Sequence, residues 1–201
     1  MSTIRFWWVR HAPVVGNNGR CYGNNDVDCD VSETNKFINL VKILPTNSFI
    51  YSSQLTRTIK TFKTAEEHGL TYLGYKIDNN FAEQNLGSWA GLKYDDLDKK
   101  TKELGVYHPN WLCDPTHTPP KGESYNDLYL RVVSSLKKII QDSSNDDFVI
   151  FSHGGPIRAA ISFALNAFPE VSLPFWIDNI SVTRLDFVEK SWHIKFINLV
   201  P

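Results

Sequence analysis

The feature that most constrains the fold is an apolar run over residues 4–9 that ends in the polar pair Arg10 and His11. Aromatic and β-branched residues dominate the run, which is typical of a buried strand, and Pro13 ends any regular structure soon after it. In open α/β sheets, ligands bind beyond the carboxyl ends of the strands. A guanidinium beside an imidazole at that place predicts an anion site, although the pair taken alone also fits the polar end of a structural strand.

Two further apolar runs end in the same way. Residues 48–51 lead into a hydroxyl-rich segment and Arg57, and residues 147–151 lead into His153 and two glycines. A helix that starts near Pro156 would direct backbone N–H groups and its positive dipole end toward His153, although a simple glycine turn also fits the pattern. If the three strands are parallel neighbours, their polar ends lie at one edge of the sheet.

Hydrophobic periodicity predicts the remaining elements, and their alternation favours an α/β fold. Further strands are expected at 72–77 and, as a hairpin, at 182–188 and 192–199. Long irregular loops are expected at 14–30 and 108–120. Helices are expected at 31–44 with Ser32 as N-cap, 55–68, 95–103, 124–141 and from about Pro156 to Phe168.

The bulk properties favour one domain that acts on a small molecule. With 201 residues, of which 42% are apolar, the chain is long enough for a single domain over residues 1–201. The net charge is −1 and the basic residues are scattered, so the sequence predicts no nucleic-acid partner and no membrane partner. The many aromatic residues fit either a core or an interface, which leaves a monomer and a homodimer both open.

Cysteine usage and the N-terminus predict a cytoplasmic protein. The three cysteines form no CxxC pair, which fits free thiols in a reducing compartment better than a disulfide framework. The first residues lack the charged-then-apolar pattern of a signal peptide, and no apolar run approaches the roughly 18 residues of a membrane helix.

Five motifs follow one another along the chain. They are VRHAP at 9–13, SSQLTRT at 52–58, Glu83 followed by LGSWAG, GES at 122–124 and SHGG at 152–155. In order and spacing they resemble the histidine phosphatase superfamily, also called the phosphoglycerate-mutase-like fold, over nearly the whole chain. The resemblance implies a three-layer α/β/α sandwich with a mostly parallel central sheet and an antiparallel edge strand, formed by a single histidine phosphatase domain.

The resemblance also implies a role for each charged residue at the strand ends. His11 would be the nucleophile that forms a phosphohistidine, and Glu83 would be the general acid. Arg10, Arg57 and His153 would hold the phosphoryl oxygens. These roles agree with elementary chemistry, because a neutral imidazole is a competent nucleophile, and two guanidiniums with a protonated His153 stabilise phosphoryl oxygens without a metal or cofactor.

Other residues are weaker candidates for the same site. Asn17 stands where many members keep an Asn that contacts phosphate, but Asn18 beside it makes the alignment ambiguous. Capping or structural roles suit the weakest candidates at least as well. The weaker candidates are Asn17 and Gly154 as phosphate-binding residues, and Arg20, Tyr22 and Gly23 as a possible substrate loop similar to that of α-ribazole phosphatase. Ser52 and Asn179 are the weakest candidates.

The loop after the nucleophile departs from the family pattern. Members usually have glycine there, whereas this chain has Ala12 and then Pro13. A methyl group narrows the space for phosphate and proline lacks a backbone donor, so this loop is expected to follow a different path.

The function expected is a metal-independent phosphomonoesterase that acts on a small phosphorylated metabolite. Phosphoglycerate mutases generally carry a longer insertion after the Glu loop and an extended C-terminal tail, which this chain lacks. A mutase and a phosphate-recognising module without turnover remain alternatives, and Glu123 and Asp127 compete with Glu83 for the role of acid. The six histidines show no HxxxH or HxH spacing, which disfavours a metal site.

Overall fold

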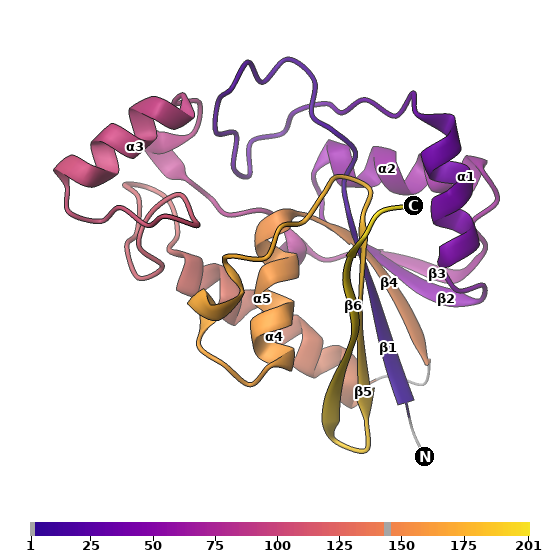
Figure 1. Ribbon diagram of the computed structural model, residues 1–201. Coiled ribbons are helices and arrows are strands. Elements are labelled where there is room, and N and C mark those ends of the chain that lie inside the picture. The colour runs from indigo at the N-terminus through magenta and orange to yellow at the C-terminus, as the bar shows by residue number, and fades with distance from the viewer. Residues whose placement is uncertain (1–2, 143–145) are drawn as a thin grey trace.

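The centre of the protein is a six-stranded sheet with the order β3-β2-β4-β1-β5-β6 (Figure 1). The structure, a computed structural model, describes residues 3–142 and 146–201. The strands are β1 (Thr3–Arg10), β2 (Ser48–Ser52), β3 (Tyr72–Ile77), β4 (Asp147–Ser152), β5 (Val182–Val188) and β6 (Ser191–Leu199). Both ends of each strand lie within one residue of the ends of a predicted apolar run. Strand positions are well defined because a shift by one residue would move every buried side chain to the other face of the sheet.

Strand directions confirm the predicted mostly parallel sheet. β1, β4, β2 and β3 run parallel, β5 pairs antiparallel with β1, and β6 pairs antiparallel with β5, so the predicted hairpin forms the antiparallel part. In the register, Arg10 lies beside Ser152, and Ser52 lies beside Phe151. The carboxyl ends of β1, β2 and β4 therefore meet at one edge of the sheet, as the parallel arrangement requires.

Helices cover both faces of the sheet and complete the three layers of the α/β/α sandwich (Figure 1). On β1, Phe6 and Trp8 pack with the helices over residues 125–142 and 154–164 on one face, whereas Trp7 and Val9 pack with those over residues 34–43 and 56–67 on the other. Burial on both faces explains why bulky residues follow one another in this strand. The helices are α1 (Thr34–Ile43), α2 (Thr56–Glu67), α3 (Tyr94–Glu103), α4 (Tyr125–Asp142) and α5 (Gly154–Ala164).

Helix α3 and the loops around it enclose a small cluster apart from the sheet. It is formed by Cys21, Leu86, Trp89, Leu97 and Cys113. This cluster joins the loop over residues 14–30 and the loop over residues 108–120 to the segment that carries Glu83. The three cysteines of the chain are free and buried.

The start of α1 corrects the sequence prediction. Glu33, rather than Ser32, occupies the N-cap position, and no side chain caps the helix. The backbone N–H of Ser32 instead donates to Asp30 Oδ1 over 2.9 Å. A serine before an apolar repeat is thus part of a local turn here, because the aspartate two residues earlier offers a competing acceptor.

The end of α5 also differs from the prediction. The helix stops at Ala164, short of Phe168, because Asn166 adopts a left-handed φ of 51°. A short 3₁₀ helix, Pro169–Ser172, follows. Asparagine tolerates this conformation better than other non-glycine residues, so it ends the helix at its C-terminal side.

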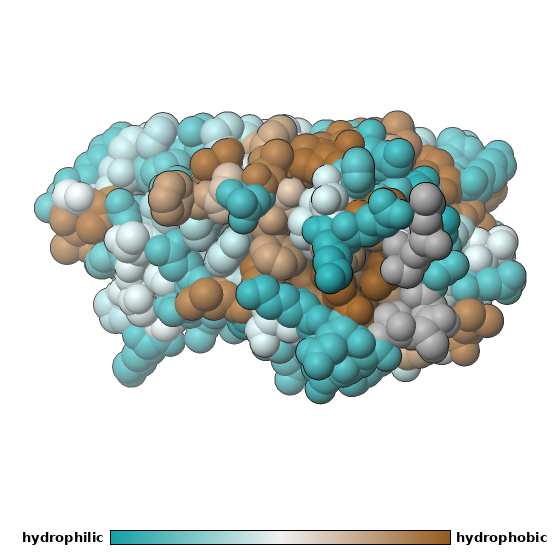
Figure 2. Space-filling model, turned by 90° about the horizontal axis from the view of Figure 1, so that it is seen from below, coloured by the Kyte–Doolittle hydropathy of each residue, from teal (hydrophilic) through white to brown (hydrophobic). Residues whose placement is uncertain are grey.

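The face of the protein seen from below mixes hydrophilic and hydrophobic side chains, with apolar ones gathered near its middle (Figure 2). Among the residues that the structure describes, no helix is both long and apolar enough to cross a membrane. This face carries the amino end of β1, so the polar strand ends described above lie on the opposite side (Figure 1).

Candidate active site

The carboxyl ends of β1 and β4 bring two histidines together although 141 positions separate them in the sequence. The ring centroids of His11 and His153 are 5.0 Å apart. Arg57, from the first turn of α2, donates from Nε to His153 Nδ1 over 3.2 Å. The structure therefore brings two imidazoles and a guanidinium together in one place, as predicted.

The His11 ring is oriented by its own loop. The ring is buried, and Nδ1 lies 2.7 Å from the carbonyl oxygen of Ala12, so Nδ1 carries the proton and Nε2 keeps its lone pair. Asn179 Nδ2 donates to the backbone oxygen of His11 over 2.7 Å. Burial, Arg57 and Arg10 lower the pKa of His11 well below 6.5, which keeps the ring neutral at pH 7.

The residue after His11 fits without narrowing the site. Ala12 is fully buried and packs in the core on the α1/α2 face of the sheet. Its N–H donates to Thr61 Oγ1 over 2.9 Å. The expectation that the Ala12 methyl group crowds the phosphate is therefore wrong, since the methyl group belongs to the core.

His153 is held between a guanidinium and a hydroxyl. Because Arg57 donates to Nδ1, Nε2 carries the proton and donates to Ser53 Oγ over 2.8 Å. Ser53 Oγ in turn lies 2.8 Å from Thr58 Oγ1. Burial, Arg57, His11 and Arg10 lower the pKa of His153 well below 6.5. His153 is therefore neutral in the free protein, and the expected protonated ring, which concerns the protein with a phosphoryl group bound, stays a prediction.

Arg57 is fully buried and anchors the loop over residues 14–30. Nη1 donates to the backbone oxygen of Asn25 over 2.7 Å, and Nη2 donates to that of Gly23 over 2.8 Å. The Tyr22 ring lies beneath the guanidinium, 5.0 Å from Cζ to the ring centroid. One side chain therefore connects His153 with the loop that covers it.

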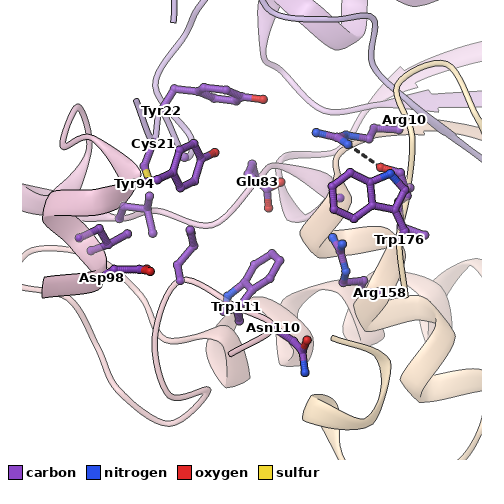
Figure 3. Close-up of a pocket in the computed structure, with 16 residues that line it drawn as sticks. Arg10, Cys21, Tyr22, Glu83, Tyr94, Asp98, Asn110, Trp111, Arg158 and Trp176 are labelled. Carbon is purple, nitrogen blue, oxygen red and sulfur yellow. Dashed lines mark hydrogen bonds between the residues drawn. The ribbon is translucent and has the colours of Figure 1, made fainter. Parts of the chain in front are cut away.

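Arg10 reaches from the end of β1 toward open space. Its Nη1 donates to the backbone oxygen of Ile177, and its buried Nε has no hydrogen-bond partner among the described residues (Figure 3). An unpaired buried donor costs free energy, so this nitrogen is suited to an incoming acceptor.

Glu83 lies beside these groups at the start of α5. Its Oε1 accepts from the backbone N–H of Gln84 over 3.0 Å, and its Oε2 accepts from that of Gly155 over 3.3 Å. No cation forms a salt bridge with Glu83 among the described residues. A side chain at position 155 would collide with this carboxylate, which explains the second glycine of the SHGG motif.

The GES motif fixes the segment that carries Glu83. Arg131 pairs with Glu123 over 2.7 Å and donates to the backbone oxygens of Ala82 over 2.8 Å and Glu83 over 3.2 Å. Glu123 also accepts from the backbone N–H of Asn85 over 2.9 Å. The competing acid Asp127 caps α4 by accepting from Ser124, so both alternatives to Glu83 have structural partners.

A pocket of about 390 Å³ opens in front of these residues (Figure 3). Figure 3 shows Arg10 and Arg158 on one side, Glu83 behind, and Tyr22 and Tyr94 on the opposite side. The side chains of α3 and of the two long loops form its outer walls. Its lining comprises Arg10, Cys21, Tyr22, Gly23, Glu83, Leu86, Tyr94, Leu97, Asp98, Asn110, Trp111, Leu112, Gly154, Arg158, Trp176 and Ile177.

The structure separates the weaker sequence candidates. Tyr22, Gly23 and Gly154 line the pocket, whereas Asn17 and Arg20 do not. Arg20 is exposed and donates from Nη1 to the backbone oxygen of Gly91 over 2.7 Å.

Ser52 is turned away from the pocket. Its hydroxyl contacts Tyr75 and the backbone oxygen of Ser53. The neighbouring Ser53, which contacts His153, is the serine of this motif that belongs to the site. Across residues 3–142 and 146–201, no three His, Cys, Asp or Glu side chains gather as a metal site requires.

Sequence reasoning missed Arg158. It lies in the second turn of α5, four residues after Gly154, and lines the pocket. The sequence signal for Arg158 was its spacing from Gly154, because positions i and i+4 lie on the same face of a helix and Gly154 lines the pocket.

Acidification should destabilise the fold through the two buried histidines. Their folded pKa values lie well below 6.5, whereas in the unfolded chain they titrate near 6.5. Below that pH the unfolded chain binds more protons, so stability that is complete above about pH 6.5 is lost as the pH falls. We expect a loss of up to about 1.4 kcal/mol per pH unit for each histidine, measured by urea unfolding between about pH 7.5 and 5.5.

The variant His11→Ala serves as the control for this pH dependence. Its slope should be about half that of the original protein, because one of the two groups that take up a proton on unfolding is gone. An unfolding free energy that stays constant over the same pH range would show that the rings are not held neutral.

Comparison with known proteins places this geometry in a family. The bifunctional protein Rv2228c of Mycobacterium tuberculosis is 30% identical over 138 residues, which cover 69% of this chain and 36% of that protein, so the chain spans about a third of this relative's length. The uncharacterized phosphatase PhoE of Bacillus subtilis is 24% identical over 200 residues, covering 95% of this chain and 92% of that protein. The α-ribazole phosphatase structure from Shigella flexneri superposes with a TM-score of 0.79 at 20% identity, covering 97% of this chain and 96% of that one, and shows the same fold. Residues 6–200 match the sequence pattern of the histidine phosphatase superfamily (branch 1), and the chain belongs to that family.

Proposed function

We propose that this protein is a phosphomonoesterase that works through a phosphohistidine on a small phosphorylated metabolite. The observation that carries the proposal is the closed group of His11, His153 and Arg57 behind a pocket whose wall presents Glu83 and Arg10. A protein that only recognises phosphate has no use for a carboxylate placed among cations, so this group favours turnover over binding.

In the first step His11 is the nucleophile. The lone pair on its Nε2 forms the bond to phosphorus while the bond from phosphorus to the alcohol oxygen breaks. Glu83 supplies the proton that this oxygen needs, because an alkoxide is a poor leaving group. Arg10 and Arg57 stabilise the charge on the phosphoryl oxygens.

In the second step water replaces the alcohol. The Glu83 carboxylate takes a proton from water, the water oxygen bonds to phosphorus, and the electron pair of the N–P bond returns to His11 Nε2. Inorganic phosphate leaves and Glu83 is protonated again. A phosphoryl dianion also opposes the effect of the guanidiniums on His153, so the ring can take up a proton on Nδ1, give up the bond that Nδ1 accepts from Arg57 and donate to a phosphoryl oxygen instead.

The family relationship and the phosphatase names among the relatives support hydrolysis, and the mutase alternative is tested directly. We expect phosphate release from p-nitrophenyl phosphate in the presence of EDTA. With 3-phosphoglycerate and a bisphosphoglycerate primer, rapid interconversion without phosphate release would identify a mutase instead. Tight phosphate binding with no turnover of any phosphomonoester would identify a recognition module.

We further propose that the enzyme acts in the cytoplasm. Cys21, Cys29 and Cys113 are free and buried, and burial raises the pKa of the Cys21 and Cys113 thiols to about 12 and about 11. Such thiols pack as small apolar groups, and a reducing compartment preserves them.

Replacing Glu83 by Gln should reduce the hydrolysis of alkyl phosphates far more than that of p-nitrophenyl phosphate. The amide cannot protonate the leaving oxygen, and p-nitrophenolate needs little protonation. We expect a fall of roughly 10²- to 10⁴-fold in kcat for an alkyl phosphate and a smaller loss for the aryl ester.

The isosteric change Glu103→Gln on the exposed surface of α3 provides the control, because it removes a carboxylate outside the pocket. Equal losses for both kinds of substrate in Glu83→Gln would remove Glu83 from the role of general acid.

A further inference from the structure

Trp176 is a large apolar side chain that the fold leaves exposed at the rim of the pocket. Its relative exposure is 73%, whereas Trp8 and Trp89 are buried. The indole nevertheless lines the pocket, and Figure 3 shows it between Arg10 and Arg158. An exposed indole at the mouth of a pocket gains free energy when it is brought out of water, so a change that covers it is favourable.

The backbone on either side of Trp176 is held by the two guanidiniums of the pocket. Arg158 Nε donates to the backbone oxygen of Phe175 over 2.9 Å, and Arg10 Nη1 donates to that of Ile177. These two bonds fix the main chain on both sides of the indole. The side chain of Trp176 is therefore the part of this segment that is left free to turn.

The chain that follows Trp176 is fastened to the end of β1. Asn179 Nδ2 donates to the backbone oxygen of His11 over 2.7 Å, and the N–H of Ile180 donates to that of Arg10 over 2.9 Å. Ile180 adopts a left-handed φ of 63°, which is strained for a β-branched residue. Contacts that hold such a conformation keep Trp176 in a fixed relation to the proposed phosphate site.

The indole itself is held only weakly. Its Nε1, the one hydrogen-bond donor of the ring, donates to Asp178 Oδ1 over 2.8 Å at the surface. Water can replace the partner of an exposed hydrogen bond, so giving up this bond costs little. The pocket of about 390 Å³ is larger than a phosphoryl group and leaves space for the ring to turn inward.

The charge in the pocket decides when the indole can close over it. Arg10 and Arg158 lie on the same side as Trp176, and Arg10 Nε has no hydrogen-bond partner among the described residues (Figure 3). Closure over an empty pocket would take water away from these guanidiniums without supplying an anion, which is costly. A bound phosphoryl dianion supplies that anion, and its attraction to the guanidiniums grows as water leaves. The open and closed forms therefore differ in their affinity for the anion, as a ligand-driven change requires.

We propose that Trp176 is a covering residue, whose indole leaves Asp178 and turns over the pocket when a phosphoryl group binds at Arg10, and turns back when phosphate is released. The proposal rests on the phosphate site of the function proposed above. It adds a residue that touches none of the reacting atoms, and it ties the exposure of one side chain to the occupancy of the site.

The test measures how strongly acrylamide quenches the tryptophan fluorescence with and without saturating inorganic phosphate, at equal ionic strength. We expect phosphate to protect the exposed indole of the original protein from the quencher. This protection should be lost in Trp176→Phe. The matched control is Trp192→Phe, because Trp192 lies on β6 and outside the pocket, and this variant should keep the protection.

The affinity for inorganic phosphate, measured by titration calorimetry, gives a second readout that needs no turnover. Trp176→Ala should bind phosphate roughly tenfold more weakly if the closed form outnumbers the open form by about ten to one in the complex. Trp176→Phe should bind it almost as well as the original protein, because a phenyl ring can still close and needs no bond to Asp178. Circular dichroism should show that each variant is folded.

The outcomes separate the covering role from the phosphatase function. Phosphate that binds without protecting the indole, or protection that persists in Trp176→Phe through the neighbouring Trp111, would overturn the covering role and leave the phosphatase function intact. Protection without hydrolysis of any ester would support the covering role and remove the phosphatase function. Absence of phosphate binding by the folded original protein would overturn both.

Discussion

Replacing His11 by alanine should lower kcat for p-nitrophenyl phosphate by at least about 10⁴-fold and abolish the phosphoenzyme. In the proposed mechanism the ring supplies the attacking lone pair, and its Nδ1 bond to the Ala12 carbonyl fixes which nitrogen carries this lone pair. No other neutral imidazole takes its place, because both nitrogens of His153 are occupied by Arg57 and Ser53. The measurement combines steady-state rates with rapid quenching of the enzyme on a radiolabelled phosphoester.

A phosphohistidine is stable to alkali and labile to acid, so the quenched protein distinguishes it from a phosphoester of serine. His193→Ala is the matched control, because this histidine is exposed on β6 and lies outside the pocket. It should keep both the rate and the label. Hydrolysis at the original rate by folded His11→Ala protein would show that the nucleophile is another group.

Replacing Arg57 by lysine should lower kcat/KM by roughly 10²- to 10³-fold although the positive charge is kept. The guanidinium donates at the same time to His153 Nδ1 and to the backbone oxygens of Asn25 and Gly23. An ammonium on a flexible stem cannot reproduce these three directions. We expect weaker inhibition by vanadate, which resembles the transferring phosphoryl group, and faster amide hydrogen exchange in residues 22–26.

A second arginine-to-lysine change separates this effect from a general loss of stability. Arg184 pairs with Asp186 over 2.8 Å and lies 4.4 Å from the centroid of the Trp7 ring, on β5 and outside the pocket. Arg184→Lys should therefore keep full activity. If Arg57→Lys kept its activity while its loop exchanged faster, Arg57 would be a structural anchor with no part in phosphate binding.

The parts of the site that could be predicted from sequence are those set by strand position. Apolar runs located β1, β2 and β4 to within one residue, and the residues at their ends followed from parallel pairing. Arg10, His11, Arg57 and His153 therefore converge as expected. The antiparallel hairpin was equally visible, because alternating residues on either side of a short polar turn define it.

The parts that could not be predicted depend on side-chain geometry. The sequence favours Glu83 over Glu123 and Asp127 only through the family resemblance, whereas the structure gives the last two a cation and a helix N-terminus as partners. Arg158 was overlooked because it comes so close to the pocket only where Gly154 has no side chain. Local competition for hydrogen bonds, as at the start of α1, is likewise invisible to periodicity.

The central place of β1 in the sheet has a consequence for how the protein folds during its synthesis. This strand lies between β4 and β5, so its partners are synthesised only after residue 146 has been added. A growing chain on the ribosome therefore holds the aromatic strand and His11 unpaired through most of translation, open to chaperones and to misassociation. The candidate site forms late and all at once, because the same strand pairing that buries β1 also brings His153 and Arg57 beside His11.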